Sequence, residues 1–304
     1  MDWKQKAKLQ SVIAKLPDAV SYEAYYKLQR HFGTLGNFNP VSRLEAGAEI
    51  WRRLIGLGFD PRNKNFLEVG TGRAPFTPIA FWLLGAGRIT TIDVNPYVKT
   101  ELLTEGLAYM RAHRDDVETL FDGNVDSGRL ATVLDPNLDP STLLEVANIN
   151  YISNGDAGST DLDDGTVDVH MSFNVLEHIP APTIVNILTE AKRLIGVDGI
   201  AIHRIDYSDH FAHDDDSISM VNFLQFDERE WDRLAGNRFM FMNRLRVDDM
   251  TELFRQAGLR VNEVADEPDN ASLIALTDVD LDQRFSNKSP ETLATLASWT
   301  VAQT

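Results

Sequence analysis

The chain has 304 residues, of which 43% are hydrophobic and 25% are charged, as in an ordinary globular protein with one large domain or two small ones. Its formal net charge of −17 argues against a nucleic-acid substrate, because the field of the protein repels a polyanion. The absence of cysteine excludes disulfides and thiolate chemistry. The sequence contains neither a transmembrane segment nor a secretion signal, so we expect a cytoplasmic protein.

Residues 1–60 predict amphipathic helices that form an N-terminal cap. Apolar side chains such as Leu9, Val12 and Leu16 recur there at helical spacing. A strand-helix-strand unit follows at residues 65–95. Its first strand, Phe66 to Val69, leads into a glycine-containing turn and a helix, and its second strand ends at Asp93.

The turn and the strand-end carboxylate predict a site for a cofactor that contains adenosine. Gly70 and Gly72 lack a β-carbon, so the backbone can turn sharply there and a ligand can approach it. Asp93 lies about 20 residues beyond the turn, where a carboxylate can accept hydrogen bonds from both hydroxyls of a ribose. A dinucleotide fingerprint needs a third glycine where Pro75 stands, and Glu68 would repel a phosphate. These residues therefore favour S-adenosylmethionine, which carries positive charge and no phosphate.

The segment Glu68-Val69-Gly70-Thr71-Gly72 resembles the first motif of class I S-adenosylmethionine-dependent methyltransferases, without the usual third glycine. The resemblance implies an α/β fold: a doubly wound, mostly parallel seven-stranded sheet of the Rossmann-like methyltransferase kind, with N-terminal helices and helical insertions. It also implies that the N-terminal helices cover the cofactor or join two copies in a homodimer, although they can equally serve only to cap the sheet.

Two later segments extend the resemblance over roughly residues 60–205. The sequence Asn154-Gly155-Asp156 matches the place where the family binds the adenine amino group, which implies that role for Asp156. Residues 165–179 resemble the fourth strand and the turn after it. The residues expected to hold the cofactor are Glu68, Gly70, Thr71, Gly72, Asp93, Asp156 and Asn174.

We expect the cofactor-binding domain to span residues 61–278. Segments longer than a simple connection predict insertions near 105–148 and 207–245, and a helix is expected from Thr183 to Ile195 before a fifth strand. Leu259–Val264 and Ala271–Leu276 read as a closing pair of strands. Residues 279–304 are expected to form a C-terminal tail, with a helix at Pro290–Trp299.

Histidines and carboxylates are concentrated in the segments that follow strands four and five. An alcohol is a poor nucleophile at neutral pH, and a histidine within hydrogen-bond reach can act as its general base. The candidates are His178, His203, His210 and His213, of which His203 or His210 is favoured first and His178 next, with Asp206 as an orienting carboxylate.

A divalent metal is the alternative means of activating a hydroxyl. Glu177-His178 resembles the Glu-x-x-Glu-His motif of metal-dependent O-methyltransferases, with Asn174 in place of the first glutamate. That resemblance implies Mg²⁺ or another divalent metal on Glu177 and His178, with His203 (or His210) completing the ligands. The same Leu-Glu-His sequence is also frequent in methyltransferases that use no metal.

The acceptor is left open by the residues themselves. Parts of the C-terminal half, including Asp209-His210-Phe211 and Asn243-Arg244-Leu245-Arg246, resemble bacterial polysaccharide-associated O-methyltransferases. This implies methylation of a sugar hydroxyl in a glycan or glycolipid precursor, in which case aromatic residues such as Phe211 and Trp231 could stack on sugar rings instead of forming a small core. The alternatives are a small-molecule acceptor, such as a natural product or quinone precursor, and a non-catalytic cofactor-binding regulatory subunit. The arginines at 233, 238, 244 and 246 predict either an anion site or a surface that balances nearby acids.

Overall fold

The computed structural model describes residues 2–33 and 35–304. Seven strands form one sheet in the order β3-β2-β1-β4-β5-β7-β6. β1 pairs in parallel with both β2 and β4, and β2 pairs in parallel with β3. The strands are β1 Phe66–Val69, β2 Ile89–Asp93, β3 Ile149–Ser153, β4 Val167–Phe173, β5 Ile195–Asp206, β6 Arg260–Pro268 and β7 Thr295–Gln303. The expected doubly wound α/β fold is thereby confirmed.

Two compact units divide the chain. The glycine-turn unit comprises Asn37–Phe173, Asn186–Ile202 and Gln303–Thr304. The histidine unit comprises Met1–Gly36, Asn174–Val185 and His203–Ala302. Among the described residues, no helix combines the length and apolar character that crossing a lipid bilayer requires.

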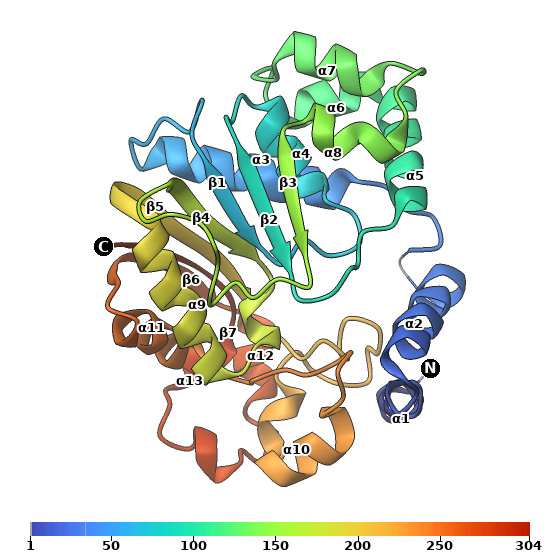
Figure 1. Ribbon diagram of the computed structural model, residues 1–304. Coiled ribbons are helices and arrows are strands. Elements are labelled where there is room, and N and C mark those ends of the chain that lie inside the picture. The colour runs from blue at the N-terminus through green and yellow to red at the C-terminus, as the bar shows by residue number, and fades with distance from the viewer. Residues whose placement is uncertain (1, 34) are drawn as a thin grey trace. The chain divides into compact units, whose positions relative to one another are not determined.

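The glycine-turn unit is built around two short strands, β1 and β2, that are buried on both faces. All four residues of β1 are buried, and Phe66 stacks on Phe81 of α4 with ring centroids 4.6 Å apart. A β-carbon on Gly47 would lie 2.5 Å from Ala80, so glycine allows α3 to pack closely against α4. The insertion expected near 105–148 is helical, and Figure 1 shows its helices grouped after β2. The helices here are α3 Val41–Gly56, α4 Phe76–Leu83, α5 Thr100–Ala112, α6 Arg114–Leu120, α7 Ser127–Leu134, η1 Pro140–Thr142 and α8 Leu143–Val146, while α9 Ala181–Leu194 has its residues from 186 on in this unit.

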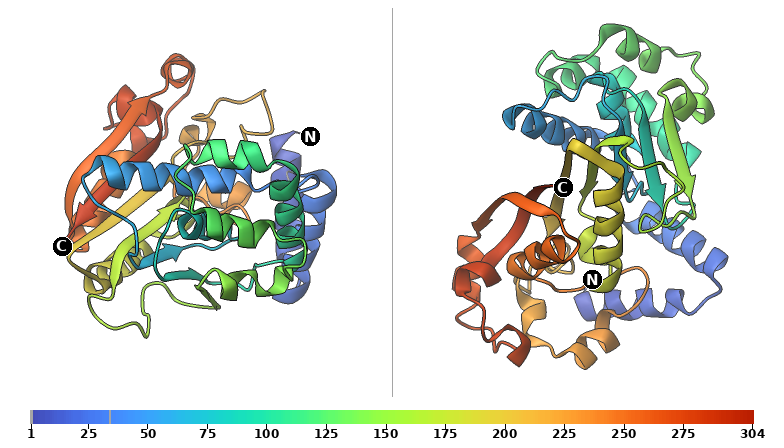
Figure 2. Two further views of the ribbon diagram at one scale, coloured as in Figure 1. Left: turned by 90° about the horizontal axis from the view of Figure 1, so that it is seen from above. Right: turned by 60° about the vertical axis from the view of Figure 1, so that its left-hand side comes forward.

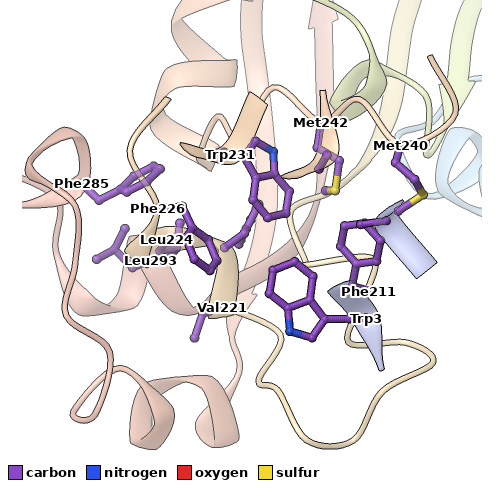
Figure 3. Close-up of a cluster of buried hydrophobic side chains, with 13 residues drawn as sticks. Trp3, Phe211, Val221, Leu224, Phe226, Trp231, Met240, Met242, Phe285 and Leu293 are labelled. Carbon is purple, nitrogen blue, oxygen red and sulfur yellow. The ribbon is translucent and has the colours of Figure 1, made fainter. Parts of the chain in front are cut away.

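The histidine unit has an aromatic core that joins the N-terminal helix to the segment 207–245. The ring centroid of Trp3 lies 5.4 Å from that of Phe211 and 5.8 Å from that of Phe226. Figure 3 shows these three side chains in the buried cluster. Phe223 and Trp231 are buried in the same cluster. These aromatic residues form a core, so they do not supply a sugar-stacking surface. The helices are α1 Trp3–Ala14, α2 Asp18–Phe32, η2 Leu176–His178, η3 Asn222–Gln225, α10 Glu228–Ala235, α11 Val247–Gln256, α12 Asn270–Ala275, η4 Gln283–Phe285 and α13 Pro290–Ala294.

The C-terminal part differs from the sequence-based expectation. The segment expected as a strand at Ala271–Leu276 is helix α12, because the side chain of Asp269 caps it by accepting a 2.7 Å hydrogen bond from the Ser272 N–H. The helix expected at Pro290–Trp299 ends at Ala294, and β7 follows. β7 lies between β5 and β6 in the sheet, and Figure 2 shows β6 and β7 side by side. Residues 279–304 are therefore not a tail outside the sheet.

Candidate functional site

The glycine turn after β1 is tied to the end of β2. Gly70 and Gly72 have φ values of 87° and 67°, which favour glycine. The Gly72 N–H donates to Asp93 Oδ2 at 2.9 Å, and the Asn95 N–H donates to Asp93 Oδ1 at 3.0 Å. A β-carbon on Gly72 would meet no atom within 4 Å. A carboxylate and an open stretch of backbone therefore lie side by side.

The side chain of Glu68 is linked to the glycine turn through Thr91 and Thr71. Its side chain is buried, and its Oε2 accepts a 2.5 Å hydrogen bond from Thr91 Oγ1, which lies 2.6 Å from Thr71 Oγ1. Burial raises the pKa of Glu68 to about 8, against the effect of the Thr91 hydrogen bond. The carboxyl group is therefore mostly neutral at pH 7, and its contact with Thr91 indicates that it positions Thr71 and the turn. Sequence reasoning missed Thr91, whose only signal is its place on the buried strand β2.

Asp156 is brought to the same end of the strands. The Gly155 N–H donates to the backbone oxygen of Asp93 at 3.0 Å. A β-carbon on Gly155 would lie 2.8 Å from methyl groups of Ile92 and Ile152, so only glycine permits this approach. Asp156 itself is exposed, and its Oδ1 accepts from the Gly158 N–H at 2.8 Å. Thus three expected cofactor residues, Gly72, Asp93 and Asp156, lie at one edge of the glycine-turn unit.

Asn174 directly follows β4 and belongs to the histidine unit. Its φ is 56°, a left-handed conformation that asparagine tolerates better than most residues. Its N–H donates to the Arg204 backbone oxygen at 2.9 Å, and its Oδ1 accepts a hydrogen bond from Arg204 Nη1. The side-chain oxygen therefore faces an arginine, and a role for Asn174 toward the cofactor stays a prediction.

The histidine unit brings Glu177, His178 and His210 together. Each offers one ligand atom, and these three atoms all lie within 4.8 Å of one another. The rings of His178 and His210 have centroids 4.9 Å apart. His203, expected both as a base and as a metal ligand, is not in this group: it is fully buried with its ring 5.4 Å from that of Phe254. The alternation of β5 turns its side chain away from the residues at the end of the strand.

Hydrogen bonds from a neighbouring segment hold the Glu177 turn in place. Asn243 Nδ2 donates to the backbone oxygens of Leu176 and Ile179 at 2.8 Å and 2.9 Å. The Asn243 N–H donates to the backbone oxygen of Glu177 at 2.9 Å. His178 Nδ1 lies 2.9 Å from the backbone oxygen of Phe241, which assigns the proton to Nδ1 and leaves a lone pair on Nε2. No local pattern in the sequence marks Asn243 as a positioning residue.

Asp206 is the charged carboxylate beside this group. Its Oδ1 accepts from the Ser208 N–H at 2.8 Å and from Ser208 Oγ at 2.6 Å, and its Oδ2 lies 3.7 Å from His210 Nε2. Burial alone would raise the pKa of Asp206, but its interactions with His210 and Ser208 hold it well below the ordinary value. Ser208 Oγ also lies 2.8 Å from His213 Nε2.

Glu177 and His178 both favour their uncharged forms. Burial raises the pKa of Glu177 well above its ordinary value, and neither of its oxygens has a hydrogen-bond partner among the described residues. His178 is an exposed residue, but desolvation by the protein atoms around its ring and then the neighbouring His210 lower its pKa to about 4. A neutral carboxyl and a neutral imidazole thus lie beside a charged Asp206.

Of the two alternatives for the arginines at 233, 238, 244 and 246, the contacts favour pairing within the protein over an anion site. Arg244 is buried and donates to the backbone oxygens of Phe223 and Phe226 at 3.0 Å and 2.6 Å. Arg246 is fully buried and donates to the backbone oxygens of Tyr207, Leu293 and Thr295. Arg233 and Arg238 pair with Glu230 and Asp18, respectively. The two buried guanidinium groups hold the core of the histidine unit together and cannot reach a ligand.

No protein-family model and no curated protein matches the chain. Among solved structures, a protein from Pyrococcus horikoshii OT3 is 12% identical, with 91% of this chain and 98% of that chain covered and a TM-score of 0.48. An S-adenosylmethionine-dependent methyltransferase from Mesorhizobium loti is 12% identical, covering 86% and 100% of the two chains with a TM-score of 0.44. Geranyl diphosphate C-methyltransferase from Streptomyces coelicolor A3(2), in complex with Mg²⁺, geranyl diphosphate and S-adenosyl-L-homocysteine, is 11% identical, covering 85% and 78% with a TM-score of 0.44. Similarity at this level does not assign an activity, which rests on the residues themselves.

Proposed function

We propose that this chain is an S-adenosylmethionine-dependent methyltransferase that holds the adenosine part of its cofactor at Gly70, Gly72, Asp93 and Asp156. The hydrogen bond from Gly72 to Asp93 carries the proposal, because it places a carboxylate beside backbone that a ligand can approach. Each Asp93 oxygen accepts one backbone N–H and retains a further lone pair for a ribose hydroxyl. Exposed Asp156 is suited to accept a hydrogen bond from the adenine amino group.

The start of α4 supports this cofactor over a dinucleotide. A pyrophosphate is held by several free backbone N–H groups at a helix N-terminus. Pro75 occupies the N-cap position of α4 and has no N–H to donate. Buried Asp93 would also repel a phosphate placed on the ribose. S-adenosylmethionine has no phosphate, so it needs neither free N–H groups at a helix N-terminus nor a ribose site that tolerates a phosphate.

For methyl transfer, we propose that the acceptor is a hydroxyl group. If a histidine acts as the general base, His210 is the favoured residue to remove the proton of that hydroxyl. His210 lies beside charged Asp206, which would stabilise the imidazolium that forms. His178 is the weaker candidate because desolvation and the neighbouring His210 lower its pKa to about 4. His203 is withdrawn as a base because it is fully buried in β5.

A sugar hydroxyl of a glycan or glycolipid precursor is the acceptor class that we propose first, on the resemblance of the C-terminal segments. The stacked, half-buried pair of Tyr25 and Phe239, with ring centroids 4.2 Å apart, is the aromatic feature that supports it. A natural product or quinone precursor is the alternative acceptor, and a cofactor-binding subunit without catalysis is the alternative function. Transfer of labelled methyl groups to a panel of sugars, quinols and phenols distinguishes these three.

Calorimetric titration tests the cofactor assignment. S-adenosylmethionine and S-adenosylhomocysteine should bind with one site per chain, whereas NADH should give no saturable heat. Asp93→Ala should weaken binding by at least about tenfold, which corresponds to about 1.4 kcal/mol. The control is Asp161→Asn, an exposed acid in the same unit, which should bind like the wild type. Saturable binding of NADH without binding of the sulfonium cofactor would overturn the proposal.

A further inference from the structure

Glu177 is a buried carboxyl group in the short turn η2 that follows β4. The residue is 2% exposed, and neither carboxylate oxygen has a hydrogen-bond partner among the described residues. Burying a polar group without a hydrogen bond destabilises a protein. Groups of this kind in a native fold call for a specific explanation, and an ion that binds there is one.

Two imidazoles converge on the same point. One ligand atom from each of His178 and His210 lies within 4.8 Å of the other and of a Glu177 oxygen. His210 Nε2 is buried and, like the Glu177 oxygens, has no hydrogen-bond partner within the described chain. Donor atoms on a tetrahedral ion at about 2.1 Å lie about 3.4 Å apart, so small side-chain rotations bring the three into range.

The surroundings orient these groups as metal ligands are oriented in proteins. His178 donates through Nδ1 to the Phe241 backbone oxygen, which leaves the lone pair of Nε2 available to a metal ion. The Asp206 carboxylate lies 3.7 Å from His210 Nε2. Asn243 fixes the turn that carries Glu177 and His178 through three hydrogen bonds. A set of ligands with supporting hydrogen bonds is the arrangement that binds a metal with high affinity.

We propose that Glu177, His178 and His210 form a site for one divalent first-row transition metal such as Zn²⁺, Mn²⁺ or Co²⁺. Two imidazoles and one carboxylate suit these ions, whereas Mg²⁺ prefers a shell of oxygens. Three protein ligands leave at least one position open, where the oxygen of a water molecule or an acceptor hydroxyl can coordinate. The site replaces the expected set with His203. A metal held by His210 would take the place of the histidine base, because a coordinated imidazole nitrogen has no lone pair left to accept a proton. The existence of the site does not depend on the proposed methyl transfer.

Metal titration without any cofactor tests the proposal. The purified full-length chain is treated with a chelator, dialysed, and titrated with Co²⁺ while visible absorption and heat are recorded. One Co²⁺ per chain should bind, with absorption bands typical of nitrogen and oxygen ligands. His210→Ala and Glu177→Gln should each weaken binding by more than about 100-fold, a larger loss than removal of a supporting group causes. Millimolar Mg²⁺ should not displace the Co²⁺.

His213→Ala is the matched control, because its ring lies 5.1 Å from that of His210 in the same segment but outside the three-residue group. This variant should bind Co²⁺ within a few-fold of the wild type. Circular dichroism and thermal unfolding of each variant without metal show whether it is folded. Absence of stoichiometric Co²⁺ binding by the wild type, or equal loss in His213→Ala and folded His210→Ala, would overturn the site. Neither result bears on cofactor binding, which is measured separately.

Discussion

The backbone N–H of Gly72 donates a 2.9 Å hydrogen bond to the side chain of Asp93, a residue 21 positions further along the chain. Parallel pairing of β1 with β2, in which Val69 lies opposite Ile92, brings the two together. The bond couples the shape of the glycine turn to the orientation of the carboxylate. It therefore positions both groups that a ribose would contact.

Gly72→Ala tests the turn against a matched glycine. Gly72 and Gly123 have φ values of 67° and 70°, and a β-carbon on either would meet no atom within 4 Å. Each alanine variant should lose about 1 kcal/mol of stability through backbone strain. Only Gly72→Ala should also weaken binding of S-adenosylhomocysteine, by about tenfold or more. Chemical denaturation and calorimetry measure the two effects, and equal binding by both variants would contradict the assignment of the turn.

Glu68→Gln should change how stability depends on pH. The pKa of Glu68 is raised to about 8 in the folded protein by burial, above its ordinary value of 4.5. The folded state therefore favours the protonated form, and the wild type should lose stability as pH rises from about 4.5 to 8. The glutamine variant lacks this loss, so its stability relative to the wild type should increase by about 4 kcal/mol between pH 5 and 9. Denaturant titrations at several pH values measure this, with exposed Glu145→Gln as the unchanged control. A constant difference between Glu68→Gln and the wild type would refute the role of burial.

Arg246→Met should be strongly destabilising. The fully buried guanidinium of Arg246 donates to the backbone oxygens of Tyr207, Leu293 and Thr295. Methionine fills much of the volume but leaves those buried oxygens unpaired, so we expect a loss of about 3–5 kcal/mol. Arg233→Met is the control, since the Arg233 side chain is 75% exposed, and it should change stability by less than about 0.5 kcal/mol. Equal unfolding midpoints for the two variants would be inconsistent with this reasoning.

Asn243→Ala should weaken metal binding without removing a ligand. Its side chain bridges the backbone oxygens of Leu176 and Ile179, on either side of Glu177 and His178. Loss of such a supporting group typically lowers metal affinity by about 10–100-fold. A Co²⁺ titration measures the change in affinity. An absorption spectrum of the Co²⁺ complex like that of the wild type would show that the ligands stay the same. If Asn243→Ala only lowers the melting temperature and leaves Co²⁺ affinity unchanged, its role is structural.

Much of the fold was predictable because it depends on local patterns. Apolar runs identified β1 and β2, and Gly70, Gly72 and Asp93 marked the turn and the strand end. The C-terminal strand β7 was missed because Thr295–Gln303 follows a short helix and shows no clear strand signal by itself. Its identity as a strand depends on neighbours in the sheet that are distant in the sequence.

Local sequence was enough to predict the glycine turn, the carboxylate at the end of β2 and the order of the first strands, because backbone conformation and hydrophobic periodicity are encoded within short segments. Three further features could be found only in the folded protein: His210 and not His203 meets Glu177 and His178, Arg244 and Arg246 are buried, and Glu68 bonds to Thr91. Such outcomes depend on which side chains long-range packing brings within a few ångströms, and on how much water that packing removes from them.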